Sequence, residues 1–432
     1  MTNQSEPPEE FEEQSDAAEE EYPEIQDGPP HRRYAGRVLL TAFLVVVCGL
    51  VLYACWPWLL PAFIYEGPMV ELAGENEVTL AWYMTRPVDS GMMVRLEGKS
   101  PREIAVQTNG TRCRARIADL VSGQSYPYVI LRGDHELLRA EFRSNKTAGQ
   151  QFSFLAFGDS GRASPDQYLL AARMSNYDVD LVVHTGDLIY SRGERYRYRD
   201  RFFKPYLPLL KRVCFRPSIG NHDVTEPIDE SAYFEVFDLP ENGPAGITPE
   251  HEYWFDYADA RFVILDTERP EPVLKENVAP WLRSVLQDAP TLWKFVVFHR
   301  PPYTAAKHAP NEAVQRTIVP VLEDMNVDLV FSGHDHLYER TYPIRGGKRA
   351  EDGPVYIITG AGGAELYQAQ PPEKRPDYIA IAYDQTHSFT HVTVSGQELT
   401  LEQIALDGAQ VDSWILKKAP MHSNDAPAEN RP

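Results

Sequence analysis

The sequence predicts a mixed α/β domain preceded by a small β-sandwich and an apolar N-terminal segment. From Phe152 to about Ala405, short apolar stretches alternate with helical patterns, which is typical of an α/β domain. Between Gly67 and about Thr147, apolar and polar residues alternate in short runs separated by turn residues, and this pattern predicts an all-β unit. A chain of 432 residues has room for both.

The N-terminus is strongly acidic. Residues 1–30 contain 11 Asp and Glu and no Lys or Arg, which leaves 52 acidic and 42 basic residues in the rest of the chain. We expect residues 1–36 to form a disordered, cytoplasmic head, because they offer almost no aliphatic side chains for a core. The acidic remainder argues against a nucleic-acid partner held by phosphate contacts.

An uncharged run follows, from Val38 to Tyr65, with three arginines just before it. Its length exceeds the roughly 20 apolar residues that cross a bilayer. The arginines favour a cytoplasmic N-terminus. We therefore expect residues 37–65 to be a single transmembrane anchor, with the catalytic domain periplasmic or extracellular. A buried core helix, a cleaved signal peptide and lipidation at Cys55 stay open as alternatives.

Residues 66–147 are expected to form the β-sandwich. Val78, Leu80 and Trp82 alternate with polar residues, as in a strand with one buried face. Leu120, followed six residues later by Tyr126, resembles the tyrosine corner of fibronectin type III domains. We expect a fibronectin type III-like spacer or packing module.

The α/β domain is expected over residues 148–410, with a polar tail over 411–432. Helices are predicted over Pro165–Asn176 and Asn311–Met325. A closing β-stretch is predicted around residues 391–404.

Five apolar strands of this domain each end in a polar turn. They are FLAFGDSG (154–161), LVVHTGDLIY (181–190), FRPSIGNHD (215–223), FVVFH (295–299) and LVFSGHDH (329–336). Seven side chains of metal-ligand type stand at these ends: Asp159, Asp187, Tyr190, Asn221, His299, His334 and His336. In an α/β sheet, ligands collect beyond the carboxyl ends of the strands, so we expect all seven in one place. One Gly-Asp turn would be weak evidence, but five such motifs in order are hard to obtain by chance.

These ligands define the chemistry. Two carboxylates, three imidazoles, one amide and one phenol suit iron, manganese, zinc or magnesium. If one carboxylate bridges, seven residues supply four ligands to each of two metals. Two metals about 3.5–4 Å apart can ionise a water and stabilise an in-line displacement at phosphorus.

The motifs GDSG, GDLIY, GNHD, VVFH and GHDH resemble the calcineurin-like metallophosphoesterases and, within them, the purple acid phosphatases. The resemblance covers about residues 150–405. Gly161 stands where many metallophosphoesterases have His, and Tyr190 fills the GDxxY position that marks the purple acid group. The resemblance implies a four-layer αββα sandwich as the catalytic fold.

The resemblance also implies a ligand assignment. Asp159, Asp187, Tyr190 and His336 would hold a ferric ion. Asp187 would bridge to a divalent iron, zinc or manganese ion that Asn221, His299 and His334 complete.

Three further residues are singled out beside the ligands. His222, directly after Asn221, is expected to face the phosphate as a hydrogen-bond donor or general acid. His308 matches a substrate-binding histidine of the family, although Ala309 breaks the usual pair. Asp223 is expected to support the ligands from behind.

The expected function is hydrolysis of phosphomonoesters by metal-bound hydroxide, with an acidic optimum and a small phosphorylated substrate. A phosphodiesterase or nucleotide hydrolase using the same site is one alternative. A membrane-tethered binding protein with a structural metal site is the other.

Overall fold

The computed structural model describes residues 40–49, 61–74, 76–98, 100–224 and 229–418. The chain forms two compact units, Met1–Pro61 and Ala62–Pro432. In the first unit, residues 40–49 are helical. The predicted acidic head (1–36) lies outside the described residues.

The predicted membrane anchor over residues 37–65 is wrong. Among the described residues, no helix has the length and apolar character needed to span a membrane. At the C-terminal end of this range, Ile64 already belongs to a strand and pairs with Met84. The assignment as a single-pass membrane protein is therefore also wrong.

The second unit begins with eight strands. They are β1 (Ile64–Gly74), β2 (Glu77–Met84), β3 (Met92–Leu96), β4 (Arg102–Ala105), β5 (Gln107–Asn109), β6 (Arg112–Ile117), β7 (Ser125–Arg132) and β8 (His135–Arg143). One four-stranded sheet has the order β4-β3-β7-β8, while β1, β2, β6 and β5 form the end of a larger sheet. Trp82, Cys113 and Tyr128 are fully buried in one core cluster, as the alternating pattern predicts. The Tyr126 hydroxyl accepts a hydrogen bond from the Val121 N–H at 2.7 Å.

The larger sheet has ten strands in the order β23-β22-β21-β9-β10-β11-β1-β2-β6-β5. Its further members are β9 (Phe152–Phe157), β10 (Leu181–His184), β11 (Cys214–Pro217), β21 (Ser388–Ser395), β22 (Glu398–Ala405) and β23 (Gln410–Lys417). Strands β9, β10 and β11 are parallel, and β1 joins β11 in parallel through Val70 and Cys214. One continuous sheet therefore links the N-terminal strands to the site-bearing strands.

A second sheet has seven strands in the order β12-β13-β14-β15-β19-β16-β20. They are β12 (Tyr253–Tyr257), β13 (Ala260–Ile264), β14 (Trp293–Val297), β15 (Leu329–Ser332), β19 (Val355–Thr359), β16 (Tyr338–Thr341) and β20 (Ile379–Tyr383). Strands β13, β14, β15 and β19 are parallel, and a short hairpin joins β17 (Ile344–Arg345) and β18 (Lys348–Arg349).

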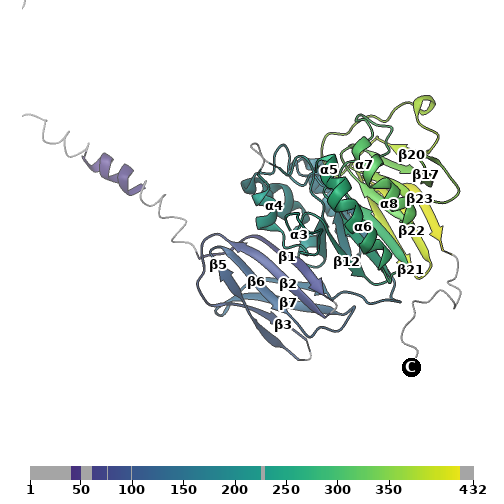
Figure 1. Ribbon diagram of the computed structural model, residues 1–432. Coiled ribbons are helices and arrows are strands. Elements are labelled where there is room, and N and C mark those ends of the chain that lie inside the picture. The colour runs from purple at the N-terminus through teal and green to yellow at the C-terminus, as the bar shows by residue number, and fades with distance from the viewer. Residues whose placement is uncertain (1–39, 50–60, 75, 99, 225–228, 419–432) are drawn as a thin grey trace, which may run out of the picture. The chain divides into compact units, whose positions relative to one another are not determined.

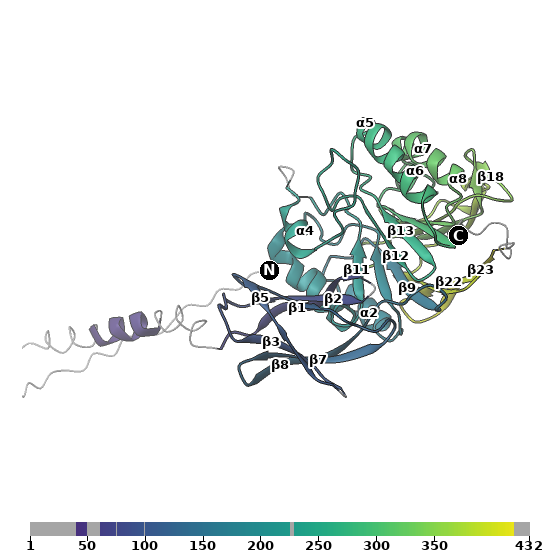
Figure 2. The ribbon, with the colours of Figure 1, turned by 60° about the horizontal axis from the view of Figure 1, so that its bottom comes forward.

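The helices are short. They are α2 (Pro165–Met174), α3 (Lys204–Leu210), α4 (Ser231–Val236), α5 (Glu271–Val273), α6 (Ala279–Gln287), α7 (Glu312–Thr317) and α8 (Val319–Asp324), with the single turns η1 (Arg195–Arg197), η2 (Arg199–Phe203), η3 (Leu274–Val278) and η4 (Pro372–Lys374). Figure 1 shows α5 to α8 gathered on one side of the second unit, and Figure 2 shows β1 to β8 at one end of it.

Aromatic side chains fill the space between the two sheets. The Phe154 ring of the ten-stranded sheet lies 5.2 Å from the Phe262 ring and 5.6 Å from the Phe295 ring of the seven-stranded sheet, measured between centroids. On its other face, the seven-stranded sheet shares a second core with α6, α7 and α8, which includes Leu282 and Leu322. The predicted mixed α/β architecture is confirmed.

Two elements differ from the prediction. The helix expected over residues 311–325 divides into α7 and α8, because Pro320 lacks an N–H and occupies the first turn of a new helix. The region after residue 410, predicted to be a polar tail, continues as β23, which pairs with β22 over most of its length. In β23, Trp414 and Leu416 are partly buried and Ile415 between them is exposed, as expected for a strand. This stretch of three apolar residues is too short to predict a strand in an otherwise polar sequence.

Candidate metal centre

The two sheets bring their site residues to the same edge. Asp159, Asp187 and Asn221 follow β9, β10 and β11 of the ten-stranded sheet. His299 follows β14, and His334 and His336 follow β15, all of the seven-stranded sheet. Because parallel strands present their carboxyl ends at one edge, two packed sheets can supply one site from both sides.

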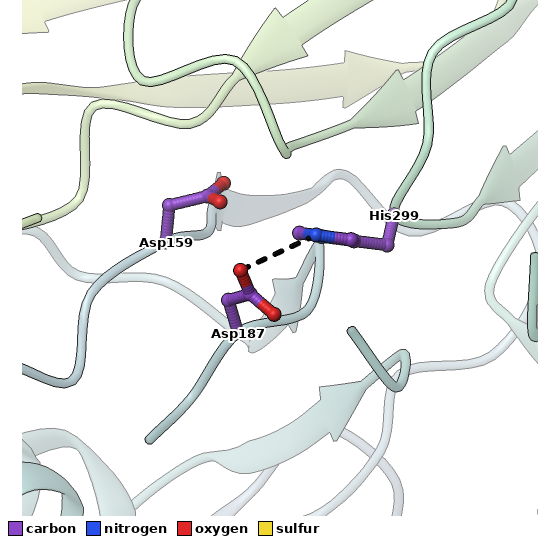
Figure 3. A group of neighbouring side chains, drawn as sticks. All are labelled: Asp159, Asp187 and His299. Atoms are coloured by element: carbon purple, nitrogen blue, oxygen red, sulfur yellow. Dashed lines mark ion pairs between the residues drawn. The ribbon is translucent and has the colours of Figure 1, made fainter. Parts of the chain in front are cut away.

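Three of these side chains form the centre of the site. One ligand atom from each of Asp159, Asp187 and His299 lies within 4.8 Å of the other two (Figure 3). His299 Nε2 is 3.4 Å from Asp187 Oδ2, and the three residues are at most 1 % exposed. Buried carboxylates in contact with an imidazole are a geometry that suits a metal cation.

Tyr190 connects one half of the ligand set. Its phenol oxygen lies 3.0 Å from Asp159 Oδ1, 3.0 Å from Asp187 Oδ2 and 2.8 Å from His336 Nε2. His336 Nδ1 donates to the Glu365 carbonyl at 2.6 Å, which leaves Nε2 directed at the site.

Asn221 and His334 complete the other half. The Asn221 Oδ1 atom is 3.2 Å from His299 Nε2, and His299 Nδ1 donates to the Thr185 carbonyl at 2.8 Å. The His334 ring lies edge-on to the His299 ring, with centroids 5.1 Å apart. The structure thus brings all seven sequence-predicted ligand residues into one connected cluster.

The backbone at three of these residues is left-handed. Asp159, Asp187 and His334 have φ angles of 55°, 57° and 69°. Asp and His adopt this region more readily than most residues, at an energetic cost that surrounding contacts must offset. For Asp159, such contacts include the Gly186 carbonyl, which accepts from its N–H at 3.0 Å, and the His334 N–H, which donates to its carboxylate at 3.0 Å.

Asp223 holds two of the ligand turns together. Its buried carboxylate accepts hydrogen bonds from four backbone N–H groups at 2.7 to 3.1 Å. These donors are Asp187, Leu188, Ile189 and Gly220. The carboxylate therefore fixes the turn after β10 against the turn after β11, which agrees with its expected place behind the ligands.

The electrostatics of the cluster fit a metal. Burial and the carboxylates of Asp159 and Asp187 raise the pKa of the Tyr190 phenol well above its ordinary value. Although burial lowers it, Asp187 and Asp159 raise the pKa of His299 to about 10. Without another cation, His299 thus carries the positive charge that the buried carboxylates require. A metal ion would replace that proton and favour the phenolate, so the residues present fit the group.

Arg300 and Glu268 orient His334, and the sequence analysis did not include them. Arg300 Nη1 donates to His334 Nε2 at 3.1 Å, while Arg300 Nε donates to Glu268 at 2.8 Å. Burial and the positive charges of His299 and Arg300 lower the pKa of His334 to about 2, so its ring is neutral. Because a neutral ring that accepts at Nε2 carries its proton on Nδ1, the Arg300 contact fixes the orientation and the tautomer of the His334 ring. The position of Arg300 directly after His299 was the only sequence signal.

Gly161 explains why a tyrosine serves this site. A Cβ atom at residue 161 would lie 1.7 Å from the Leu188 carbonyl oxygen. No side chain, and so no histidine, fits at this position. The Tyr190 phenol, from the next turn, occupies the space beside Asp159 instead.

The two predicted histidines outside the ligand set also lie at the site. His222 Nδ1 is 2.6 Å from the Ser191 carbonyl, and its ring centroid is 4.5 Å from that of Tyr190. The His308 ring stacks on the His334 ring with centroids 4.1 Å apart. His308 Nδ1 is 2.9 Å from Oδ1 of the buried Asp335, a partner that the sequence analysis missed.

Comparison with known proteins agrees with this geometry. Residues 152–338 match the family model for calcineurin-like phosphoesterases, and residues 353–413 match the model for iron/zinc purple acid phosphatase-like protein C. Purple acid phosphatase 17 of Arabidopsis thaliana is 25 % identical over 307 residues, which cover 63 % of this chain and 86 % of the relative. Purple acid phosphatase 21 of the same plant is 27 % identical over 327 residues, which cover 70 % and 72 %.

The fold is also that of a solved relative. Purple acid phosphatase PPD1 from yellow lupin (Lupinus luteus) seeds superposes with a TM-score of 0.68 at 19 % identity, covering 81 % of this chain and 74 % of that one. At this identity, the likeness shows the fold alone.

The steric role of Gly161 can be tested by Gly161→Ala. Because the Cβ atom would meet a backbone carbonyl rather than a flexible side chain, we expect a loss of about 3 kcal/mol or more in unfolding free energy. Denaturant unfolding measures this loss. Gly74→Ala is the control, since its nearest neighbour is a movable Glu77 side-chain atom at 3.2 Å. Equal stability of the two variants would contradict the steric account.

Proposed function

Because the chain is a purple acid phosphatase-like metallophosphoesterase, we propose that it hydrolyses phosphomonoesters at a dinuclear metal centre. The family implies a pair of iron, zinc or manganese ions. The observation that carries the acid-phosphatase assignment is the Tyr190 phenol, which touches Asp159, Asp187 and His336 together. A phenolate is a strong ligand for a hard, highly charged ion, so we assign a ferric ion to this half of the site.

The ligands divide between two ions. We assign the ferric ion to Asp159, Asp187, Tyr190 and His336, and a divalent ion to Asp187, Asn221, His299 and His334. When bound, the two ions supply Lewis acidity that ionises water and neutralises phosphoryl charge. The chain's own residues hold the ligands, bind the phosphate and deliver protons.

His222 is assigned to the phosphate. Since its Nδ1 faces the Ser191 carbonyl at 2.6 Å, its Nε2 is the nitrogen left for the substrate. In addition, the His222 N–H donates to Asp187 Oδ1 at 2.7 Å, which ties the residue to the assigned bridging ligand. A protonated His222 would donate a hydrogen bond to a phosphoryl oxygen.

His308 is assigned to the leaving group as general acid. Asp335 accepts from His308 Nδ1, and Asp335 is itself held by the Thr304 hydroxyl at 2.7 Å and the His308 N–H at 3.1 Å. A carboxylate that accepts from Nδ1 orients the ring, so that Nε2 is the nitrogen that faces the leaving oxygen as a proton donor. Asp335 is a positioning residue that acts through His308.

We also propose that residues 66–147 form a fibronectin type III-like module and residues 148–410 the catalytic domain. The hydrogen bond between the Tyr126 hydroxyl and the Val121 N–H supports the first assignment, since a tyrosine corner makes this kind of backbone contact. The four-layer αββα arrangement is proposed for the catalytic domain, with its two sheets as the inner layers.

The ferric assignment is tested by visible absorption of the metal-loaded protein. We expect a broad tyrosinate-to-iron(III) band that disappears in Tyr190→Phe and persists in Tyr196→Phe, because Tyr196 is a 71 % exposed residue without ligand contacts. Metal analysis accompanies each spectrum. A colourless protein loaded with two zinc or manganese ions would contradict the ferric site and leave the phosphoesterase assignment standing.

The monoester assignment is tested with 4-nitrophenyl phosphate at acidic pH. Asn221→Ala and His222→Ala should each lower kcat/KM by about 10²-fold or more, since one loses a metal ligand and the other a phosphate donor. The exposed Asn176 and His135, changed to alanine, serve as controls. Faster turnover of bis(4-nitrophenyl) phosphate by the native protein would favour the diesterase alternative, and full activity in both site variants would refute the mechanism.

The general-acid pair is tested by its dependence on the leaving group. Asp335→Asn should slow hydrolysis of an alkyl phosphate by about 10²-fold, because a poor leaving group needs its proton. Hydrolysis of 4-nitrophenyl phosphate should fall only a few-fold. An equal loss with both substrates would assign Asp335 a purely structural role.

A further inference from the structure

Two positively charged side chains at the site lack a carboxylate partner within the described part of the chain. They are Arg162 and Lys307, both exposed, and together they are called the cationic rim. By contrast, Arg300 on the other side of the site is paired with Glu268 at 2.8 Å. The contrast matters because the chain as a whole has an excess of acidic residues.

Arg162 extends from the turn that carries Asp159. Its guanidinium carbon lies 4.5 Å from the centroid of the Tyr190 ring. Arg201 backs the same turn, with Nη1 3.4 Å from the Gly161 carbonyl. Burial, together with the positive charges of Arg197 and Arg162, lowers the pKa of Arg201. Like charges are therefore crowded here, although Glu194 pairs with Arg197 at 2.7 Å and also partly opposes the effect on Arg201.

Lys307 stands on the other side of His336. Its Nζ lies 3.9 Å from the centroid of the Tyr367 ring, and Tyr367 stacks on the His336 ring with centroids 4.0 Å apart. The hydroxyl of Tyr190, whose ring Arg162 covers, lies 2.8 Å from His336 Nε2. The two cations flank His336, each supported by a tyrosine ring.

This arrangement points to a second anionic group. In the proposed mechanism, the bound metal ions and His222 already bind the phosphoryl group that reacts. Unpaired cations beside it would attract a further negative charge, and a guanidinium matches the geometry of a phosphate. We propose that the cationic rim binds a second phosphate group of the substrate, so that the enzyme prefers organic diphosphates or bisphosphates over simple monoesters. This inference rests on the proposed phosphoesterase function.

The position of the rim agrees with the direction of the leaving group. Lys307 directly precedes His308, and the Tyr367 ring lies 5.4 Å from the His308 ring between centroids. A second phosphate between Arg162 and Lys307 would therefore lie next to the residue assigned to protonate the leaving oxygen.

Arg162→Gln in the metal-loaded, full-length protein tests the proposal. With adenosine diphosphate, kcat/KM should fall about tenfold more than with 4-nitrophenyl phosphate, because only the first substrate has a second phosphate. Arg162→Lys should recover part of the loss, since it keeps the charge. Arg349→Gln is the matched control, because Arg349 lies 3.5 Å over the Tyr342 ring, outside the site, and should change neither substrate.

Fructose 1,6-bisphosphate shows whether the rim recognises the second phosphate of a bisphosphate as well as that of a diphosphate. A tenfold selective loss with this substrate as well would support recognition of bisphosphates in general, and a loss confined to adenosine diphosphate would support recognition of diphosphates. Equal losses with all three substrates, or no loss with any, would overturn the proposal.

A binding measurement tests the cationic rim independently of the proposed phosphoesterase activity. Calorimetry with methylenediphosphonate, which resists hydrolysis, should show about tenfold weaker binding to Arg162→Gln, with orthophosphate binding changed less. If the native protein failed to turn over 4-nitrophenyl phosphate, the proposed function would fail, and this measurement would still decide on the rim. Equal affinity of the native and variant proteins for methylenediphosphonate would refute it.

Discussion

The structure depends on keeping two carboxylates buried side by side. Asp159 and Asp187 are at most 1 % exposed, and both lie within 3.0 Å of the same phenol oxygen. Removing such charges from water costs several kcal/mol each unless a positive charge is close. His299 supplies that charge in the structure, and its pKa of about 10 reflects the demand. The buried carboxylates therefore require a cation whichever substrate the site takes.

The scaffold meets this demand by joining two sheets rather than by extending one. Strands β9, β10 and β11 supply the carboxylates and the amide, while β14 and β15 supply the imidazoles. Asp223 fixes two turns of the first group through four backbone N–H groups. The Thr185 carbonyl, from the turn after β10, accepts from His299 and so connects the first group to the second. Most contacts that set the metal geometry thus use backbone atoms, which hold their positions better than long side chains.

The sequence predicts the ligand residues but not how the strands that carry them are divided between two sheets. Each ligand follows a buried strand and begins a polar turn, and this local pattern is readable without tertiary information. The pairing of those strands into two sheets is set by contacts between distant residues, such as Phe154 with Phe262 and Phe295, and no local pattern records them. The membrane anchor failed for a related reason. An apolar run does not specify which element its residues enter, and at its end Ile64 and Tyr65 belong to strand β1 rather than to a helix. Arg300 and Asp335 were missed because single charged residues have no period.

The two sides of the site differ in how their charges are balanced, and this difference assigns them different tasks. Beside His334, Arg300 is paired with Glu268 and His308 with Asp335, so these side chains are fixed before any ligand arrives. Fixed groups suit proton transfer, since geometry must be maintained through the reaction. Beside His336, Arg162 and Lys307 rest on tyrosine rings without a carboxylate in the described chain. A cation on an aromatic face keeps its charge and its mobility, and it gains most when an anion reaches it. The charge pattern therefore supports the proposal that proton transfer takes place beside His334 and recognition of a second phosphate beside His336.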